Sequence, residues 1–240
     1  DEGLDFGDAL AQAQALGYAE ADPAFDIEGV DAAHKTALLA ANAFGMPVRF
    51  ADAQVEGITA LQRVDVACAE QLGFRVKLLG VARRREEGVE LRVQPALVPA
   101  THLHAQVNGS MNGIMVKGDA AGVTMYYGAG AGSEQTASAV IADLVDVARL
   151  DGTHAGQRVP HTGFHAHAVR ELPVLPRAAV RSAHYLRVPV QAVTDIAAVA
   201  ELLAAQRLPV RQLVLANGPA DAAPQVLVVT QSGLQSAVDL

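Results

Sequence analysis

Four carboxylates and one lysine lie close together near the start of the chain, in the segment AQALGYAEADPAFDIEGVDAAHK, which ends at Lys35. The carboxylates are Glu20, Asp22, Asp26 and Asp31. A carboxylate can hold the ammonium group of a small molecule, and a positioned lysine can donate or accept a proton. This segment is therefore the candidate for acid–base chemistry on an amino compound.

Two helices must position these side chains. Apolar residues at helical spacing predict a helix over 6–16 that stops at Gly17, and a second helix over 32–44 begins near Asp31. Asp31 and Lys35 then share one face. The Ala/Leu-rich composition predicts that the second helix is largely buried, which would carry Lys35 toward the interior. The alternative is a solvated acidic loop followed by a surface ion pair, and the spacing leaves both open.

The glycine-rich loop from Gly128 to Ser133 follows a predicted strand and opens a predicted helix, so its free N–H groups could face an anion. It lacks the third glycine spacing and the later acidic residue of a dinucleotide-binding fingerprint. Gly130 and Gly132 are therefore candidates for cofactor contact, and a plain structural turn is the alternative.

The remaining pattern predicts an α+β fold, an open mixed β-sheet covered by helices on one face. A helix is expected over 61–72, and strands are expected over 75–81, 88–93, 105–107, 114–117 and 123–127. The first two strands are joined by the charged turn at 83–87.

Composition excludes several classes of partner. The net charge of the 240-residue chain is −8, and its basic run at 83–85 is followed at once by two glutamates, so neither nucleic acid nor a membrane surface is expected. The single cysteine, Cys68, excludes an internal disulfide and fits a reducing cytoplasm. No apolar run approaches the roughly 20 residues that span a bilayer. Three histidines spaced His161-x-x-x-His165-x-His167 invite a metal interpretation, but the surrounding prolines predict a linker and no metal site.

The segment from Ala13 to Lys35 has the pattern A-x-x-x-G-Y-A-x-x-D-P-x-x-D-I-x-G-x-D-x-x-x-K, which resembles the signature of homoserine dehydrogenase. The resemblance continues through LGFRVKLLGVARR, GVELRVQPALVP and YGAGAGSEQTASAVIADLVDVAR, which ends at Arg149. It implies NAD(P)-dependent interconversion of L-homoserine and L-aspartate 4-semialdehyde, in threonine, methionine and isoleucine biosynthesis.

The resemblance also implies roles for individual residues. Glu20 would bind the substrate, Lys35 would be the proton donor and acceptor, and Asp26 and Asp31 would contact the substrate or orient the lysine. The cofactor, NADP or NAD, would be bound mainly by an N-terminal domain that this chain lacks. Crowded carboxylates favour the charged form of the lysine, which suits the reductive direction. A homodimer or higher oligomer is expected.

Three parts are expected along the chain: a catalytic domain over 1–150, a linker over 151–183, and an incomplete regulatory module over 184–240. The module's predicted order of strand, helix, strand, strand and the start of a helix resembles an ACT domain, a βαββαβ unit. Threonine is the implied effector, but the turn at 192–195 lacks the family's glycine, and the chain stops before the last strand.

Two competing functions remain at this stage. The first is a non-catalytic amino-acid-binding regulator that uses the ACT-like tail. The second, a glycosidase with paired acids, is weaker because such sites need isolated carboxylates without an adjacent lysine.

Overall fold

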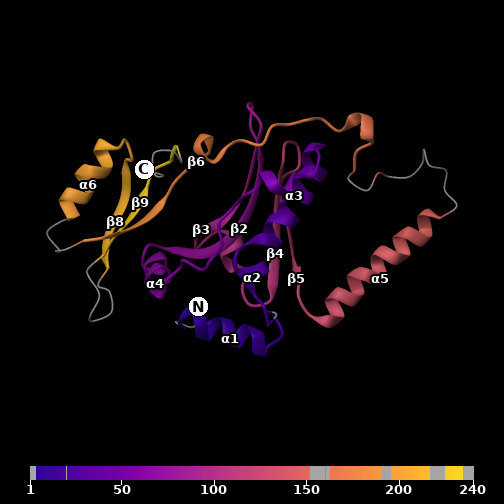
Figure 1. Cartoon of the computed structure of the whole chain (residues 1–240), viewed down its shortest axis with the longest axis horizontal. Helices are drawn as coiled ribbons and strands as arrows, with labels where there is room; N and C mark the ends of the chain where they lie inside the picture. Colours follow the sequence, from indigo (N-terminus) through magenta and orange to yellow (C-terminus); the bar gives the residue numbers. More distant parts are fainter. Residues whose placement is uncertain are drawn as a thin grey trace.

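The computed structural model describes residues 4–19, 21–151, 160, 163–190, 196–216 and 225–234. It is a mixed α+β structure with several small sheets. In Figure 1 the helix α3 lies against the strands β2 and β3 near the middle of the molecule, with α6 and its sheet at one end and α5 at the other. The α-helices are α1 (Phe6–Ala15), α2 (Ala24–Ile27), α3 (Val30–Phe44), α4 (Arg63–Gln71), α5 (Ser133–Leu150) and α6 (Ile196–Ala205).

Within the described residues the strands form four small sheets, and the expected single open sheet is not what they form. The central sheet has the order β1-β3-β2, with β1 parallel to β3 and β2 antiparallel to it. A hairpin of β4 and β5 forms a separate sheet, and β10 pairs with β6. The strands are β1 (Gln54–Val55), β2 (Phe74–Arg84), β3 (Val89–Pro99), β4 (Met111–Gly118), β5 (Gly122–Ala129), β6 (Arg181–Ser182), β7 (Tyr185–Pro189), β8 (Val210–Ala216), β9 (Gln225–Thr230) and β10 (Gly233–Leu234).

The predicted pair of strands joined by a charged turn is confirmed as the long hairpin β2–β3. The strand expected over 105–107 is wrong, because the 3-10 helix η2 (Leu103–Gln106) occupies this stretch. The reason is local: the side chain of His102 accepts a hydrogen bond from the His104 N–H at 3.3 Å, and Ala105 N–H donates to the His102 carbonyl. Side-chain capping of this kind favours a turn over a strand.

The C-terminal sheet has the order β7-β9-β8 and is antiparallel throughout. Its core is formed by Val226 and Val228 of β9 with Val199 and Leu203 of α6. Residues 233–234 form a strand where a helix start was expected at Ser232. The turn at 192–195, His154, His161 and the end of the chain lie outside the described residues.

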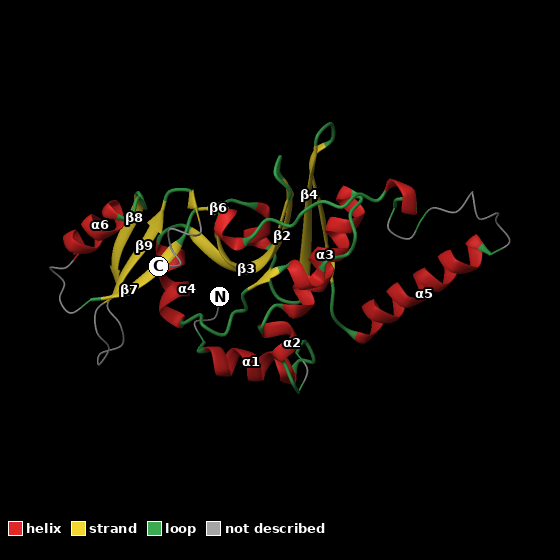
Figure 2. Ribbon diagram, turned by 45° about the horizontal axis from the view of Figure 1, so that its top comes forward, coloured by secondary structure: helices red, strands yellow, loops and turns green. Residues whose placement is uncertain are grey.

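The segment 163–182 runs along the central body before it reaches β7, as the upper part of Figure 2 shows. Arg170 N–H donates to the carbonyl of Gly45, which follows α3. Further along, Val89 N–H donates to the Pro173 carbonyl, and Leu175 N–H donates back to the Val89 carbonyl. These backbone hydrogen bonds join the expected linker to α3 and β3.

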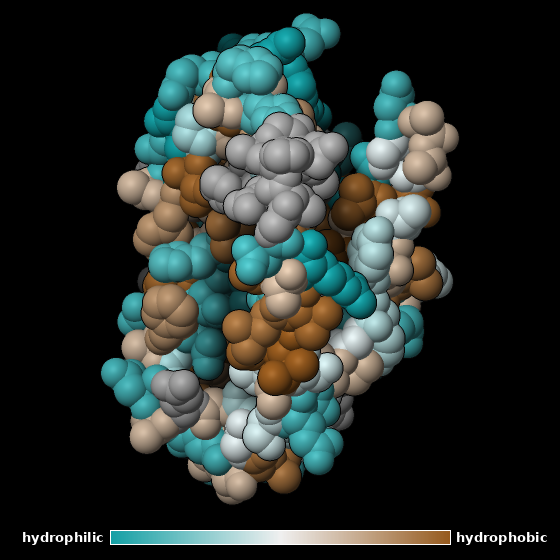
Figure 3. All heavy atoms as spheres, turned by 90° about the vertical axis from the view of Figure 1, so that its right-hand side faces the viewer, coloured by the Kyte–Doolittle hydropathy of each residue, from teal (hydrophilic) through white to brown (hydrophobic). Residues whose placement is uncertain are grey.

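None of the residues of the 18-residue helix α5 is buried, whereas the 15-residue helix α3 has a buried face. Val140, Ile141 and Leu144 lie on one side of it and are each more than half exposed. Figure 3, which looks at the molecule from the side where α5 lies, shows hydrophobic side chains open to solvent there. An apolar helix face of this size is normally covered by another surface.

Candidate functional site

Local contacts fix the backbone of the loop that leads into α3. Asp22 Oδ1 accepts a hydrogen bond from Ala24 N–H at 3.1 Å, and Gly29 adopts φ +80° immediately before α3. Gly57 lies against the junction between α2 and α3, because a Cβ atom on it would lie 2.3 Å from the Ile27 carbonyl oxygen. The positive φ at position 29 and the close approach at position 57 both favour glycine, and the Asp22 side chain favours the turn that follows it.

Asp31 and Lys35 form an ion pair at the start of α3. Asp31 Oδ2 lies 2.5 Å from Lys35 Nζ, as the i,i+4 spacing predicts. The expectation that Lys35 points toward the interior is wrong, because its side chain is 69% exposed and that of Asp31 is 35% exposed. The buried face of α3 is made of other residues: Ala33, Thr36, Ala37, Ala40 and Ala41. The pair therefore lies at the surface.

The structure places the other two predicted substrate-binding acids differently. Asp26 lies on α2, is exposed, and accepts a hydrogen bond from Gly29 N–H through its backbone carbonyl at 3.0 Å. Among the described residues, Lys35 pairs with Asp31 and not with Asp26. Glu20 lies outside the described residues.

Apolar side chains flank the ion pair. Leu38 and Leu39, one turn beyond Lys35, are 52% and 41% exposed. Beside them the ring of His34 lies 3.8 Å from that of Phe50 and 5.5 Å from that of Phe25, both measured between ring centres. A charged pair bordered by exposed apolar groups has the composition of one wall of a binding site.

The loop with Gly130 and Gly132 joins the end of β5 to the start of α5. A Cβ atom on Gly130 would lie 1.7 Å from Asn112 Nδ2, and one on Gly132, which has φ +118°, would lie 2.3 Å from Gln135 Oε1. The positive φ favours glycine at position 132, whereas a side chain at position 130 would require the Asn112 side chain to move. The space beside these glycines is filled by the chain's own side chains, so this loop does not by itself form a cradle that fits a nicotinamide dinucleotide.

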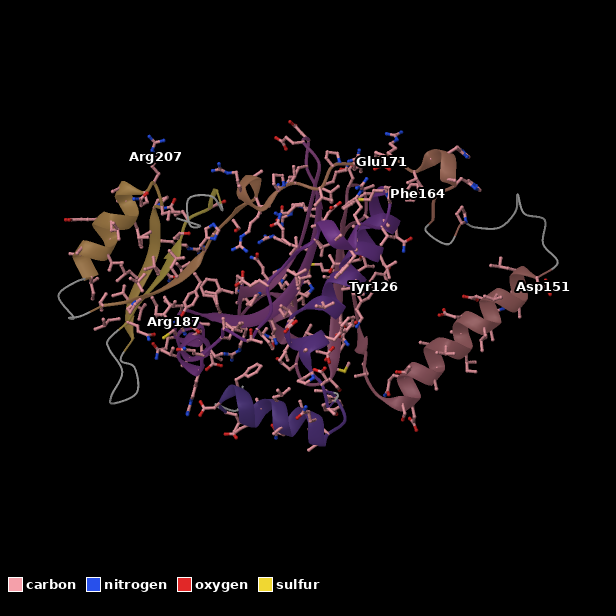
Figure 4. All side chains as sticks on the ribbon, viewed as in Figure 1. Tyr126, Asp151, Phe164, Glu171, Arg187 and Arg207 are labelled. Carbon is pink, nitrogen blue, oxygen red and sulfur yellow. The ribbon has the colours of Figure 1, made fainter. Side chains whose placement is uncertain are left out.

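A buried polar cluster, which the sequence did not predict, surrounds Asp65 of α4, a residue that is 4% exposed. Its carboxylate accepts hydrogen bonds from Tyr185 Oη at 2.6 Å, Arg187 Nη1 at 2.7 Å and Gln62 N–H at 2.8 Å. Burial, and then the hydrogen bond to Asp65, raise the pKa of Tyr185. Figure 4 shows Arg187 lying beside α4, so this cluster fastens the C-terminal sheet to the central body.

Only the part of this cluster at the start of α4 can be recognised from the sequence. Gln62 followed three residues later by Asp65 is a helix-start pattern, and the structure has the corresponding capping box. The partners on β7 lie 120 and 122 residues away along the chain, and no local pattern connects them.

Within the described ranges, no group of three or more His, Cys, Asp or Glu side chains is arranged to hold a metal ion. Within the same ranges, no helix combines the length and the apolar character needed to cross a membrane.

Comparison with known proteins adds an independent line of evidence. The sequence profile of the family described as homoserine dehydrogenase matches residues 1–145. A homoserine dehydrogenase of Pseudomonas aeruginosa is 57% identical over 188 residues, which is 78% of this chain and 43% of that protein. One from Neisseria gonorrhoeae is 43% identical over 236 residues, or 98% of this chain and 54% of that protein.

Solved structures agree with the sequence comparison. The crystal structure of a homoserine dehydrogenase from Thiobacillus denitrificans superimposes with a TM-score of 0.90 at 49% identity, covering 100% of this chain and 54% of that one. A Staphylococcus aureus homoserine dehydrogenase gives a TM-score of 0.72 at 34% identity, covering 96% and 55%. The chain spans about half the length of the relatives that it matches. It belongs to the homoserine dehydrogenase family.

Proposed function

We propose that this chain supplies the substrate-binding part of an NAD(P)-dependent homoserine dehydrogenase that interconverts L-homoserine and L-aspartate 4-semialdehyde. The observation that carries the proposal is the Asp31–Lys35 ion pair, held at the exposed start of α3 within the matched signature. An ammonium beside a carboxylate is a proton donor whose position is fixed by its partner.

Lys35 handles the proton in this proposal. In the reductive direction its ammonium gives a proton to the aldehyde oxygen, while the carbonyl carbon receives a hydride; in the oxidative direction the neutral amine takes the hydroxyl proton. The nicotinamide cofactor, when bound, supplies or accepts the hydride. Asp31 keeps Nζ in place, and the 69% exposure of Lys35 lets water return or remove the proton in the free enzyme.

The carboxylates of the loop hold the substrate. Homoserine and the semialdehyde both carry an α-ammonium group, and charge-assisted hydrogen bonds to carboxylates are the strongest way to hold one. Glu20 and Asp26 are assigned to this task, and Asp31 is assigned both to the substrate and to the lysine. The matched signature and the surface position of Asp26 support the assignment.

NAD or NADP is bound mainly outside these 240 residues. Two observations support this division: the chain spans about half of its relatives, and the loop at Gly130 and Gly132 forms no cradle of its own. The loop then meets only the edge of the cofactor. The apolar side chains around the ion pair and on α5, with Leu38 and Leu144 more than half exposed, fit surfaces that the rest of the enzyme covers.

We extend the proposal to the C-terminal part, over 184–240, as an ACT-like regulatory module reached through a linker over 151–183. The strand order β7-β9-β8 with α6 on one face supports it, since a βαββαβ unit gives this order. Threonine is the proposed effector, with weak binding because the turn at 192–195 lacks glycine. A cytoplasmic homodimer or higher oligomer completes the proposal.

The test compares this chain with the full-length enzyme that carries it. The full-length enzyme should reduce NADP or NAD with homoserine, and the chain alone should produce no NADPH or NADH, although calorimetry should detect homoserine binding. Turnover by the chain alone would contradict the proposed division. Amino-acid binding at the C-terminal module with no turnover in the full-length enzyme would instead support the regulatory protein.

A further inference from the structure

Helix α3 approaches the central sheet closely where Thr36 lies over Gly80 of β2. A Cβ atom on Gly80 would lie 1.9 Å from Thr36 Oγ1 and 3.2 Å from Thr36 Cβ. Thr36 is 7% exposed, and its hydroxyl donates a hydrogen bond to the Ala32 carbonyl at 2.7 Å. A glycine inside a strand often marks such a close approach, and any other residue would push Thr36 away.

Small side chains make up most of this face of α3, and Phe44 packs against the same cluster at the C-terminal end of the helix. Ala33, Ala37 and Ala40 are each at most 1% exposed, and Ala37 and Ala40 pack in the same cluster as Leu91 of β3. In the first two turns the buried residues of α3 are Ala33, Thr36 and Ala37, so the distance between helix and sheet there depends on the contact of the Thr36 side chain with the Gly80 backbone.

The residue that pairs with Gly80 in the β2–β3 hairpin also lies against the segment just before α3. Gly80 pairs with Val93 of β3, and Val93 Cγ1 would lie 3.2 Å from a Cβ atom on Gly29, the residue before α3. Asp31 lies between these two supports, and Lys35 directly precedes Thr36. The first two turns of α3 are thus located by Gly29 at one end and Gly80 at the other.

We propose that Gly80 is a positioning residue for the reaction: by leaving room for Thr36 it sets the height of α3, and with it the position of Lys35 Nζ against the substrate oxygen. The proposal rests on the proposed function of Lys35. An alanine at position 80 would force a displacement of roughly 1 Å, and misplacement of this size in an active site costs about 10²-fold in rate.

Four variants of the full-length enzyme test it: Gly80→Ala, Thr36→Ala, the double variant, and Gly118→Ala as a matched control. Gly118 ends β4, and a Cβ atom there would lie 3.7 Å from its nearest neighbour, an ordinary contact. We expect Gly80→Ala to lower kcat for semialdehyde reduction about 100-fold per folded molecule, without a change in the KM for NADPH or NADH. Gly118→Ala should stay near the parent, and the double variant should turn over at about the rate of Thr36→Ala alone, since the clashing hydroxyl is gone.

Structures and calorimetry of the same variants distinguish a failure of this proposal from a failure of the proposed function of Lys35. An unshifted α3 in Gly80→Ala with turnover within twofold of the parent would overturn the proposal, as would a folded double variant that stays as slow as the single one. If Gly80→Ala does not fold, the double variant decides in the same way. A Lys35→Ala enzyme with normal turnover would instead refute the proposed function, even where Gly80→Ala visibly displaces α3.

Discussion

The carboxylate of Asp31 and the ammonium of Lys35 lie 2.5 Å apart on the open side of α3, while the opposite side of the helix is packed on the central sheet. The pair is therefore held by a buried scaffold and still presented to solvent. This arrangement suits a group that must meet a substrate arriving from outside the chain. The chain spans about half of its relatives, and we propose that the rest of the enzyme supplies the opposite wall of this site.

We predict that Glu20→Ala raises the KM for homoserine more than it lowers kcat. A ligand of the ammonium group holds ground state and transition state alike, so its loss appears mainly as weaker binding. Steady-state kinetics of the full-length enzyme measure both parameters. Asp8→Ala, an exposed acid in the first turn of α1, is the control and should leave both unchanged. A fall in kcat at unchanged KM would place Glu20 in the chemical step instead.

Asp65→Ala should destabilise the chain by about 3 kcal/mol, because removing one partner of a buried ion pair leaves the other charge uncompensated. Arg187 and Tyr185 would both lose their acceptor. Denaturant unfolding of the chain measures the change, and Asp119→Ala, in the exposed turn between β4 and β5, supplies the control. A loss of stability equal to that of Asp119→Ala would show that the cluster does not hold the C-terminal sheet.

Stability should fall at alkaline pH because of Tyr185. Its pKa is raised in the folded state, so the unfolded chain loses the phenolic proton first, near its ordinary value of about 10. The stabilisation is complete below that pH and declines above it. Tyr185→Phe should be less stable at neutral pH and should lose less stability between pH 9 and 11, roughly the window set by that ordinary value. Parallel curves for the two proteins would contradict this.

Local patterns predicted much of the fold. Alternating apolar residues and a charged turn identified the β2–β3 hairpin, and the four-residue spacing identified the Asp31–Lys35 pair. The exposure of Lys35 was not predictable from composition alone. Alanine and leucine both indicated a buried helix, but in the structure the alanines are buried while Leu38 and Leu39 are 52% and 41% exposed.

Contacts between distant segments account for the remaining differences. The attachment of β7 to α4 depends on Asp65 and Tyr185, which no sequence period relates. The glycines at 130 and 132 indicated a ligand-facing loop, whereas Asn112 and Gln135 fill the space beside them. In each case the contacting residue lies on another element, or its contact depends on a side-chain conformation that the sequence does not reveal.

The most direct test of the account is the turnover of the full-length enzyme with Lys35→Ala, compared with Lys117→Ala at an exposed lysine of β4. Loss of a positioned proton donor should lower kcat for semialdehyde reduction by about 10²–10⁴-fold, with Lys117→Ala unchanged. If Lys35 and Asp31 were only a surface pair, the substitution would cost a few tenths of a kcal/mol in stability, about the worth of an exposed i,i+4 pair. A folded Lys35→Ala enzyme with near-normal turnover would contradict the assignment of Lys35 as the proton donor and acceptor.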